Sequence, residues 1–120
     1  MIGRIDDAGR ALVRVSVRVQ AGSTPLEIEA WIDTGFTGEL VLPQDVIDSL
    51  GLAQSGTVNA ELGDGSAVVL NTYTCLIDWF GREQSIEVVA NSGSLPLLGV
   101  GLLRKQKLFV DYAAKTLTIE

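Results

Sequence analysis

The triplet Asp33-Thr34-Gly35 has the clearest potential for chemistry in this sequence. It follows the apolar segment Ala30-Trp31-Ile32 and precedes a second extended run, Leu40-Val41-Leu42. A tight glycine-containing turn between two strands holds a carboxylate rigidly and leaves its oxygens open to a cleft, as the activation of a water molecule requires. The Thr34 hydroxyl can fix the turn through a local hydrogen bond. Because the chain has only one such triplet, it supplies only one such acid.

Two further elements give weight to this triplet, which alone is equally typical of an ordinary turn. Pro96-Leu97-Leu98-Gly99 places Leu97 64 positions after Asp33, and the helix-like residues 100–105 follow it. Midway between them, Gly63-Asp64-Gly65 is a strong hairpin-turn signal. The strand, glycine turn and short helix around Asp33 therefore have a weak echo around Leu98, where no acid is present.

In the order and spacing of these three elements, the sequence resembles the retropepsin-like (clan AA) aspartic proteases, and it looks most like their bacterial single-domain type. The elements are Ile32-Asp33-Thr34-Gly35, the hairpin around Asp64, and Leu97-Leu98-Gly99. The resemblance implies an aspartic endopeptidase that hydrolyses peptide bonds, with Asp33 as its catalytic residue. It also implies a homodimer, because two carboxylates that share one proton activate the water and each chain supplies one.

The resemblance assigns supporting roles around this acid. Thr34 would support the turn and donate a hydrogen bond across the dimer axis, and Gly35 would give the loop its backbone freedom. Leu97, Leu98 and Gly99 would pack against the catalytic loop and line substrate pockets. The flap that covers an extended peptide would have its tip at Leu62, Gly63, Asp64, Gly65 and Ser66.

Phe36 departs from the viral pattern, in which a small residue usually follows the triplet. The resemblance implies that this bulky side chain would lie beside the cleft and contact the substrate. The alternative function is therefore a protease-like peptide-binding or dimerisation module with little turnover. The segments 108–112 and 116–119 look more like the ending of cellular and bacterial relatives than that of viral ones.

Other residues have simpler interpretations. Asp64 at a turn tip is more typical of turn geometry than of a second catalytic acid. Cys75 lies among apolar strand residues and is more typical of a small buried side chain than of a nucleophile. Trp31 and Trp79 are more typical of core or interface aromatics than of groups that stack on a ligand.

Composition excludes several classes of function. The net charge of −6 argues against nucleic acid as a partner. The chain has no histidine and a single cysteine, which leaves no His-based triad, thiolate metal cluster or intrachain disulfide, and no cofactor is implied. The apolar run at residues 95–103 is about half the length of a membrane span, and the N-terminus lacks the apolar segment of a signal peptide. These features predict a cytoplasmic protein.

The pattern along the 120 residues predicts one mainly β domain, 1–120, that forms a small closed barrel with one or two short helices. The resemblance implies that this is an acid-protease barrel. Valines alternate with polar residues from Val13 to Val19, as in a half-buried strand. A short helix is expected from Pro43, at the first helical position, to the C-cap Gly51. The other expected strands are residues 2–5, 26–32, 40–42, 57–62, 67–78, 86–90, 108–111 and 116–119.

Overall fold

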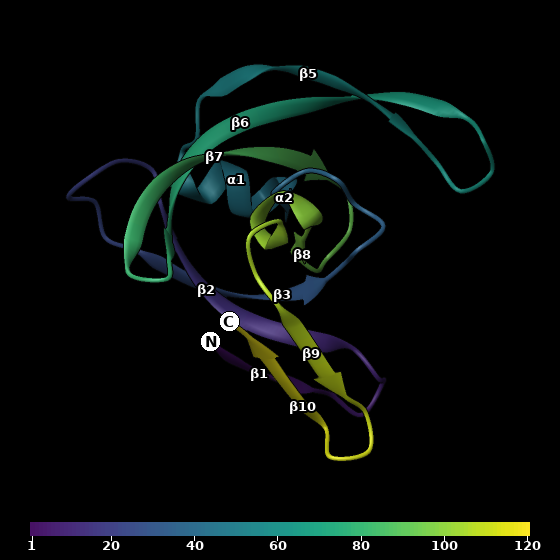
Figure 1. The fold of residues 1–120 in the computed structure, drawn as a ribbon. Helices are drawn as coiled ribbons and strands as arrows, with labels where there is room; N and C mark the ends of the chain where they lie inside the picture. Colours follow the sequence, from purple (N-terminus) through teal and green to yellow (C-terminus); the bar gives the residue numbers. More distant parts are fainter.

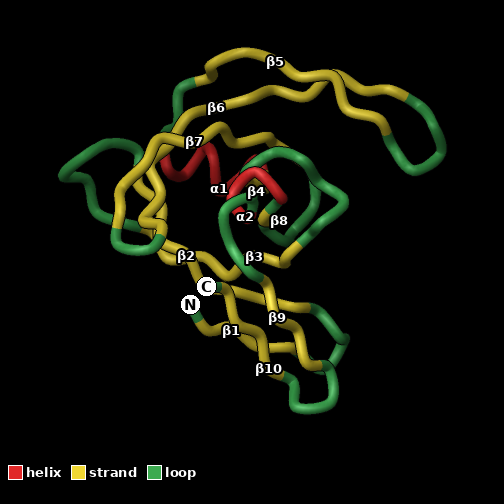
Figure 2. Tube along the Cα trace, viewed as in Figure 1, coloured by secondary structure: helices red, strands yellow, loops and turns green.

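The computed structural model describes all 120 residues and confirms the predicted fold class, a mainly β barrel with two short helices (Figure 1, Figure 2). The elements in chain order are β1 (Ile2–Ile5), β2 (Ala11–Arg18), β3 (Leu26–Ile32), β4 (Leu40–Pro43), α1 (Gln44–Leu50), β5 (Gln54–Glu61), β6 (Ala67–Trp79), β7 (Arg82–Asn91), β8 (Leu97–Leu98), α2 (Val100–Leu103), β9 (Leu108–Asp111) and β10 (Thr116–Ile119).

Six strands close into a barrel because β2 pairs along both of its edges. It is antiparallel to β3 and also to β6, where Val17 lies opposite Ile77. The ring of neighbouring strands runs β2, β3, β8, β4, β7, β6 and returns to β2. Closure leaves these strands without an open edge along the ring. It also makes one face of each strand point into a common interior.

The barrel interior holds a core cluster of 21 buried residues. The alternation in β2 has the predicted consequence, since Val13, Val15 and Val17 are at most 4% exposed while Arg14 between them is exposed. Leu98, on the short strand β8, is fully buried in the same cluster. The second element of the sequence pattern is therefore anchored in the core.

The two ends of the chain lie side by side at the base of the barrel (Figure 1). β1 lies between β2 and β10, and β9 forms the outer edge of this extension. The Met1 ammonium group donates a hydrogen bond of 2.8 Å to the Ile119 carbonyl. At the opposite edge of the sheet, β5 pairs only with β6, and the two form a long hairpin that reaches past the barrel.

The helix α1 begins one residue later than the sequence predicted. Pro43 has an extended ψ of 145° and pairs with Asn91 of β7, so it ends β4 and acts as the N-cap rather than as the first helical residue. The predicted C-cap is confirmed, because Gly51 has a left-handed φ of 71°. Neither helix has the length and apolar character needed to cross a membrane.

The seam between β2 and β6 makes a direct test of barrel closure. Ile77 is 0% exposed at this seam, whereas Val69 on the same strand is 67% exposed. We expect Ile77→Ala to lower the free energy of unfolding by about 2–5 kcal/mol, because it leaves a cavity in the closed interior. Val69→Ala is the control and should change it by about 0.5 kcal/mol or less. Urea unfolding measures both, and equal effects of the two variants would contradict the closed barrel.

Candidate active site

Asp33 lies on the turn that leaves β3, directly after the buried Ile32. Its carboxylate accepts a hydrogen bond of 3.0 Å from the Gly35 backbone N–H, and its carbonyl accepts one of 3.2 Å from the Phe36 N–H. Its own N–H donates to the Leu98 carbonyl at 2.9 Å. The side chain is half-buried, and no ion pair engages it. The turn therefore fixes the backbone of Asp33 and leaves carboxylate oxygen available.

The strand β8 holds this turn from behind. It inserts between β3 and β4, parallel to the first and antiparallel to the second, so that Leu98 lies opposite both Ile32 and Leu40. The segment that leaves β3 and the segment that enters β4 are consequently tied to the same two residues. The structure thus places Leu97 and Leu98 directly beside the Asp33 turn.

Gly99 passes so close to the Asp33 loop that a side chain has no room there. A Cβ atom at Gly99 would overlap the Gly38 carbonyl oxygen and the Phe36 ring. The next residue, Val100, donates its N–H to the Phe36 carbonyl at 2.8 Å, and the Gly99 N–H donates to the Glu39 carbonyl at 2.9 Å. The two loops therefore interlock through backbone contacts that require glycine at this position.

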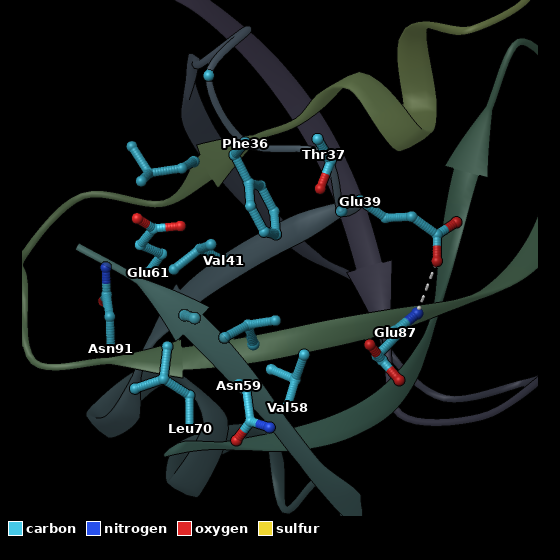
Figure 3. Close-up of a pocket in the computed structure, with 15 residues that line it drawn as sticks. Phe36, Thr37, Glu39, Val41, Val58, Asn59, Glu61, Leu70, Glu87 and Asn91 are labelled. Atoms are coloured by element: carbon cyan, nitrogen blue, oxygen red, sulfur yellow. Dashed lines mark hydrogen bonds between the residues drawn. The ribbon is translucent and has the colours of Figure 1, made fainter. Parts of the chain in front are cut away.

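A cavity of about 430 Å³ opens beside this loop (Figure 3). Gly35, Phe36 and Leu97 line it, so the cavity reaches within two residues of Asp33. The strand β5 and the neighbouring residues of β6 and β7 form its other walls. The complete lining is Gly35, Phe36, Thr37, Gly38, Glu39, Val41, Val58, Asn59, Ala60, Glu61, Leu70, Glu87, Val89, Asn91 and Leu97.

The predicted flap corresponds to the β5–β6 hairpin, but its tip lies away from the cavity. Leu62, Gly63, Asp64, Gly65 and Ser66 form the turn, and none of them lines the cavity in this conformation. The Asp64 carboxylate accepts hydrogen bonds from the Ser66 hydroxyl at 2.6 Å and the Ser66 N–H at 2.9 Å. These bonds, the one from the hydroxyl above all, lower the pKa of Asp64. In this conformation Asp64 serves the turn.

Residues from the body of the hairpin contact the cavity instead. Val58, Asn59, Ala60 and Glu61 of β5 line it, together with Leu70 of β6. Within this hairpin, the resemblance had assigned substrate contacts only to the tip. In the sequence, the apolar residues Val58 and Ala60 alternate with the polar residues Asn59 and Glu61. This alternation is the signal that could have indicated that one face of the strand is covered.

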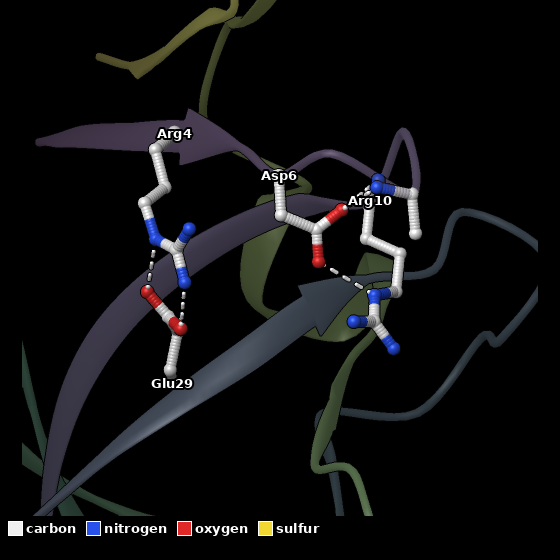
Figure 4. A network of polar contacts seen from close by, with 5 residues as sticks. Arg4, Asp6, Arg10 and Glu29 are labelled. Carbon is white, nitrogen blue, oxygen red and sulfur yellow. Dashed lines mark hydrogen bonds and ion pairs between the residues drawn. The ribbon is translucent and has the colours of Figure 1, made fainter.

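A polar network steadies the strand that leads to Asp33 (Figure 4). The Arg10 guanidinium lies 5.9 Å from the centre of the Trp31 ring, and its Nε donates to the Asp6 carboxylate at 2.7 Å. Hydrogen bonds from Arg10, chiefly that of its backbone N–H, lower the pKa of Asp6. Arg4 donates two hydrogen bonds to Glu29 at 2.9 and 2.7 Å. Trp31 itself is half-exposed on the outer face of the barrel, whereas Trp79 is buried.

No group of histidine, cysteine, aspartate or glutamate side chains in the structure is arranged to hold a metal ion. The sequence matches no protein-family model and no curated protein. Comparison with solved structures is informative. The fold is that of the retropepsin-like aspartic proteases.

A retropepsin-like aspartic protease from Rickettsia conorii aligns with 99% of this chain and 88% of its own, with a TM-score of 0.65 and 19% identity. The EIAV protease, solved with the inhibitor HBY-793, has a TM-score of 0.62 and 18% identity over 79% of this chain and 86% of its own. The simian foamy virus protease has a TM-score of 0.50 and 20% identity over 80% of this chain and 100% of its own. The TM-scores and coverage show a shared fold, and with identities this low the comparison shows the fold alone.

Gly99→Ala tests the interlock between the two loops. We expect the free energy of unfolding to fall by about 1–3 kcal/mol, because the new methyl group must displace the Phe36 ring and the Gly38 carbonyl. Gly63→Ala is the control, since nothing lies within 4 Å of a Cβ atom at that position. Thermal unfolding with circular dichroism measures both variants. Equal stability of Gly99→Ala and the wild type would show that the close approach is absent.

The reactivity of Cys75 can also be tested, because an accessible, reactive thiol would suggest a cysteine nucleophile in place of a carboxylate. The side chain is 1% exposed, and its burial, with a smaller effect of Glu39, raises the pKa of the thiol to about 12. At pH 8 we expect the native thiol to react with a disulfide reagent on the order of a hundredfold more slowly than the same thiol in urea, because the thiolate is the nucleophile. Equal rates in the native and unfolded protein would contradict this burial.

Proposed function

We propose that this protein is an aspartic endopeptidase that hydrolyses peptide bonds as a homodimer, with Asp33 as the acid that each chain contributes. One observation carries the proposal. Asp33 lies on a turn fixed by Leu98 and Gly99, next to a cavity, in a barrel that has the fold of known aspartic proteases. We include the whole of residues 1–120 in this single domain and retain the cytoplasm as its location, since one buried cysteine fits a reducing compartment.

A second copy of the chain supplies what one chain lacks. Peptide hydrolysis by this route needs a base that takes a proton from water and an acid that protonates the carbonyl oxygen. As is known for aspartic proteases, two carboxylates about 3 Å apart do both, because they cannot both ionise and so share one proton. The Asp33 carboxylate accepts a single hydrogen bond, which the backbone N–H of Gly35 in the same turn donates. A two-fold axis beside this turn would bring Asp33 of two copies together.

The rest of the proposed reaction follows from the elements around the acid. The water lies between the two Asp33 carboxylates. As it attacks the carbonyl carbon, the ionised carboxylate takes a proton from it and the protonated carboxylate gives the shared proton to the carbonyl oxygen. A carboxyl group then protonates the amide nitrogen of the tetrahedral intermediate, and the C–N bond breaks to release an amine and a carboxylic acid. Thr34 supports the turn across the axis, and Leu97 contacts the substrate from the cavity wall. The β5–β6 hairpin closes over an extended peptide and adds backbone hydrogen bonds to it. No cofactor or metal takes part.

Asp33→Asn should abolish cleavage of a mixed peptide library while the protein stays folded. We expect a loss of at least about a hundredfold in kcat/KM, since the amide can neither accept the proton from water nor share one. Asp48→Asn is the control, because Asp48 is exposed on α1 and lies outside the cavity lining. Mass spectrometry of the products over acidic to neutral pH measures the activity. Undiminished cleavage by Asp33→Asn would refute the proposed role.

Mixing the variant with wild-type chains tests the shared dyad. As Asp33→Asn is added in excess and chains exchange, the activity per wild-type chain should fall toward zero, because each heterodimer has only one carboxylate. Activity that stays constant per wild-type chain would show that one chain suffices. Peptide binding that is retained by a dimer without any cleavage would instead support the peptide-binding module, for which the bulky Phe36 in the cavity wall is the structural argument.

A further inference from the structure

The cavity beside Asp33 is lined by three glutamates and by no basic residue. Glu39, Glu61 and Glu87 contribute carboxylates, and neither lysine nor arginine occurs in the lining. None of the three takes part in an ion pair, although most of the arginines of the chain pair with acids elsewhere. Unpaired charges of one sign around a concave, partly apolar space concentrate the local potential and attract the opposite charge.

The carboxylates are arranged around an apolar floor. Figure 3 shows Glu39 and Glu87 toward one end of the cavity, Glu61 and Asn91 toward the other, and the Phe36 ring between them. Glu39 is the best fixed, because it is half-buried and one carboxylate oxygen accepts a hydrogen bond of 3.0 Å from the Glu87 N–H. The side chains of the floor are Val41, Val58, Leu70, Val89 and Leu97.

The cavity wall also holds one buried acceptor that has no hydrogen-bond partner. The side-chain oxygen of Asn91, which ends β7 in the cavity wall, is shielded from solvent and has no hydrogen-bond partner. Buried acceptors are almost always paired, and one left unpaired is costly. Both ends of the lining therefore hold acceptors that no basic side chain of the protein contacts.

We propose that the cavity is a specificity pocket for a lysine or arginine side chain of a peptide substrate. The aliphatic stem lies on the apolar floor, as long basic side chains do when only their charged head needs a polar partner. The cation lies at the end formed by Glu39 and Glu87, where carboxylate oxygens accept its N–H groups in charge-assisted hydrogen bonds. The proposal rests on the proposed function, because it treats the cavity beside Asp33 as the substrate site.

Binding is measured separately from cleavage by using the Asp33→Asn variant as a non-cleaving receptor. The probes are fluorescent eight-residue peptides of one sequence, in which lysine, arginine, norleucine or glutamate is placed at each position in turn. At low salt we expect one position at which lysine or arginine binds at least about tenfold more tightly than norleucine, with glutamate the weakest, and a preference that shrinks as salt is added.

Neutral replacements identify the groups responsible. Glu87→Gln alone and Glu39→Gln with Glu87→Gln should reduce the preference for a basic side chain to about twofold or less, while the affinity for the norleucine peptide stays unchanged. A glutamine at position 39 can still accept the Glu87 N–H, so the fold is preserved, and urea unfolding checks it. Glu27→Gln is the matched control, because Glu27 is an exposed carboxylate of β3 outside the cavity and should leave the preference intact.

The outcomes separate the pocket from the protease. Wild-type cleavage with no preference for basic residues, or a preference that survives in both glutamine variants, would overturn the pocket and leave the protease standing. A preference in binding that depends on Glu39 and Glu87, with no cleavage of any peptide by the wild type, would support the pocket and overturn the protease. Absence of binding by every peptide up to millimolar concentration would overturn the pocket.

Discussion

The insertion of β8 between β3 and β4 is the constraint on which the rest of the structure depends. Two residues, Leu97 and Leu98, pair with both strands that flank the Asp33 turn. The Leu98 carbonyl accepts the Asp33 N–H, and the Leu98 side chain is buried in the barrel core. The position of the carboxylate is therefore set by the packing of the core rather than by a free loop, which is what a precisely positioned acid requires.

Gly99 extends this constraint to the wall of the cavity. Because the backbone of Gly99 contacts the Gly38 carbonyl and the Phe36 ring, the loop after Asp33 is held against the start of α2. The same loop carries Phe36 and Glu39 into the cavity lining. One interlock thus positions the candidate acid and the side chains next to it, and a change in the loop alters both.

The β5–β6 hairpin has a different physical character. It is largely exposed and pairs with the barrel only through β6, whose inner half forms part of the ring. An element with few buried contacts opens at low free-energy cost, as a cover over a substrate must. The tip lies away from the cavity in this conformation, while Glu61 and Val58 on the body of the hairpin already line it. If the hairpin closed over a peptide, the tip would add contacts to those that Val58 and Glu61 already provide in the open conformation.

The sequence predicted the local features well because they rest on local chemistry. Alternation of valines predicted β2, Asp64-Gly65 predicted the hairpin, and Gly51 predicted the end of α1. The closure of β2 against β6 and the pairing of the chain ends join residues far apart in the sequence, and no single segment carries their signal.

The acidic lining of the cavity escaped sequence analysis for the same reason. Its acidic lining comes from β5, β7 and the loop before β4, and Glu39, Glu61 and Glu87 lie more than twenty positions apart. Only the fold brings them to one space. Pro43 was predicted as the first residue of α1, but it is the last residue of β4. The fixed φ of proline is compatible both with the end of a strand and with the start of a helix, so the sequence does not distinguish the two.

The central claim is that one chain carries half of an active centre and a two-fold axis completes it. A crystal structure with an inhibitor that mimics the tetrahedral transition state tests it most directly. The account predicts two copies of the chain around one inhibitor molecule, with the two Asp33 carboxylates about 3 Å apart and both within hydrogen-bond distance of its central hydroxyl. An inhibitor bound to a single chain, or to a dimer whose Asp33 side chains face separate regions of solvent, would contradict it.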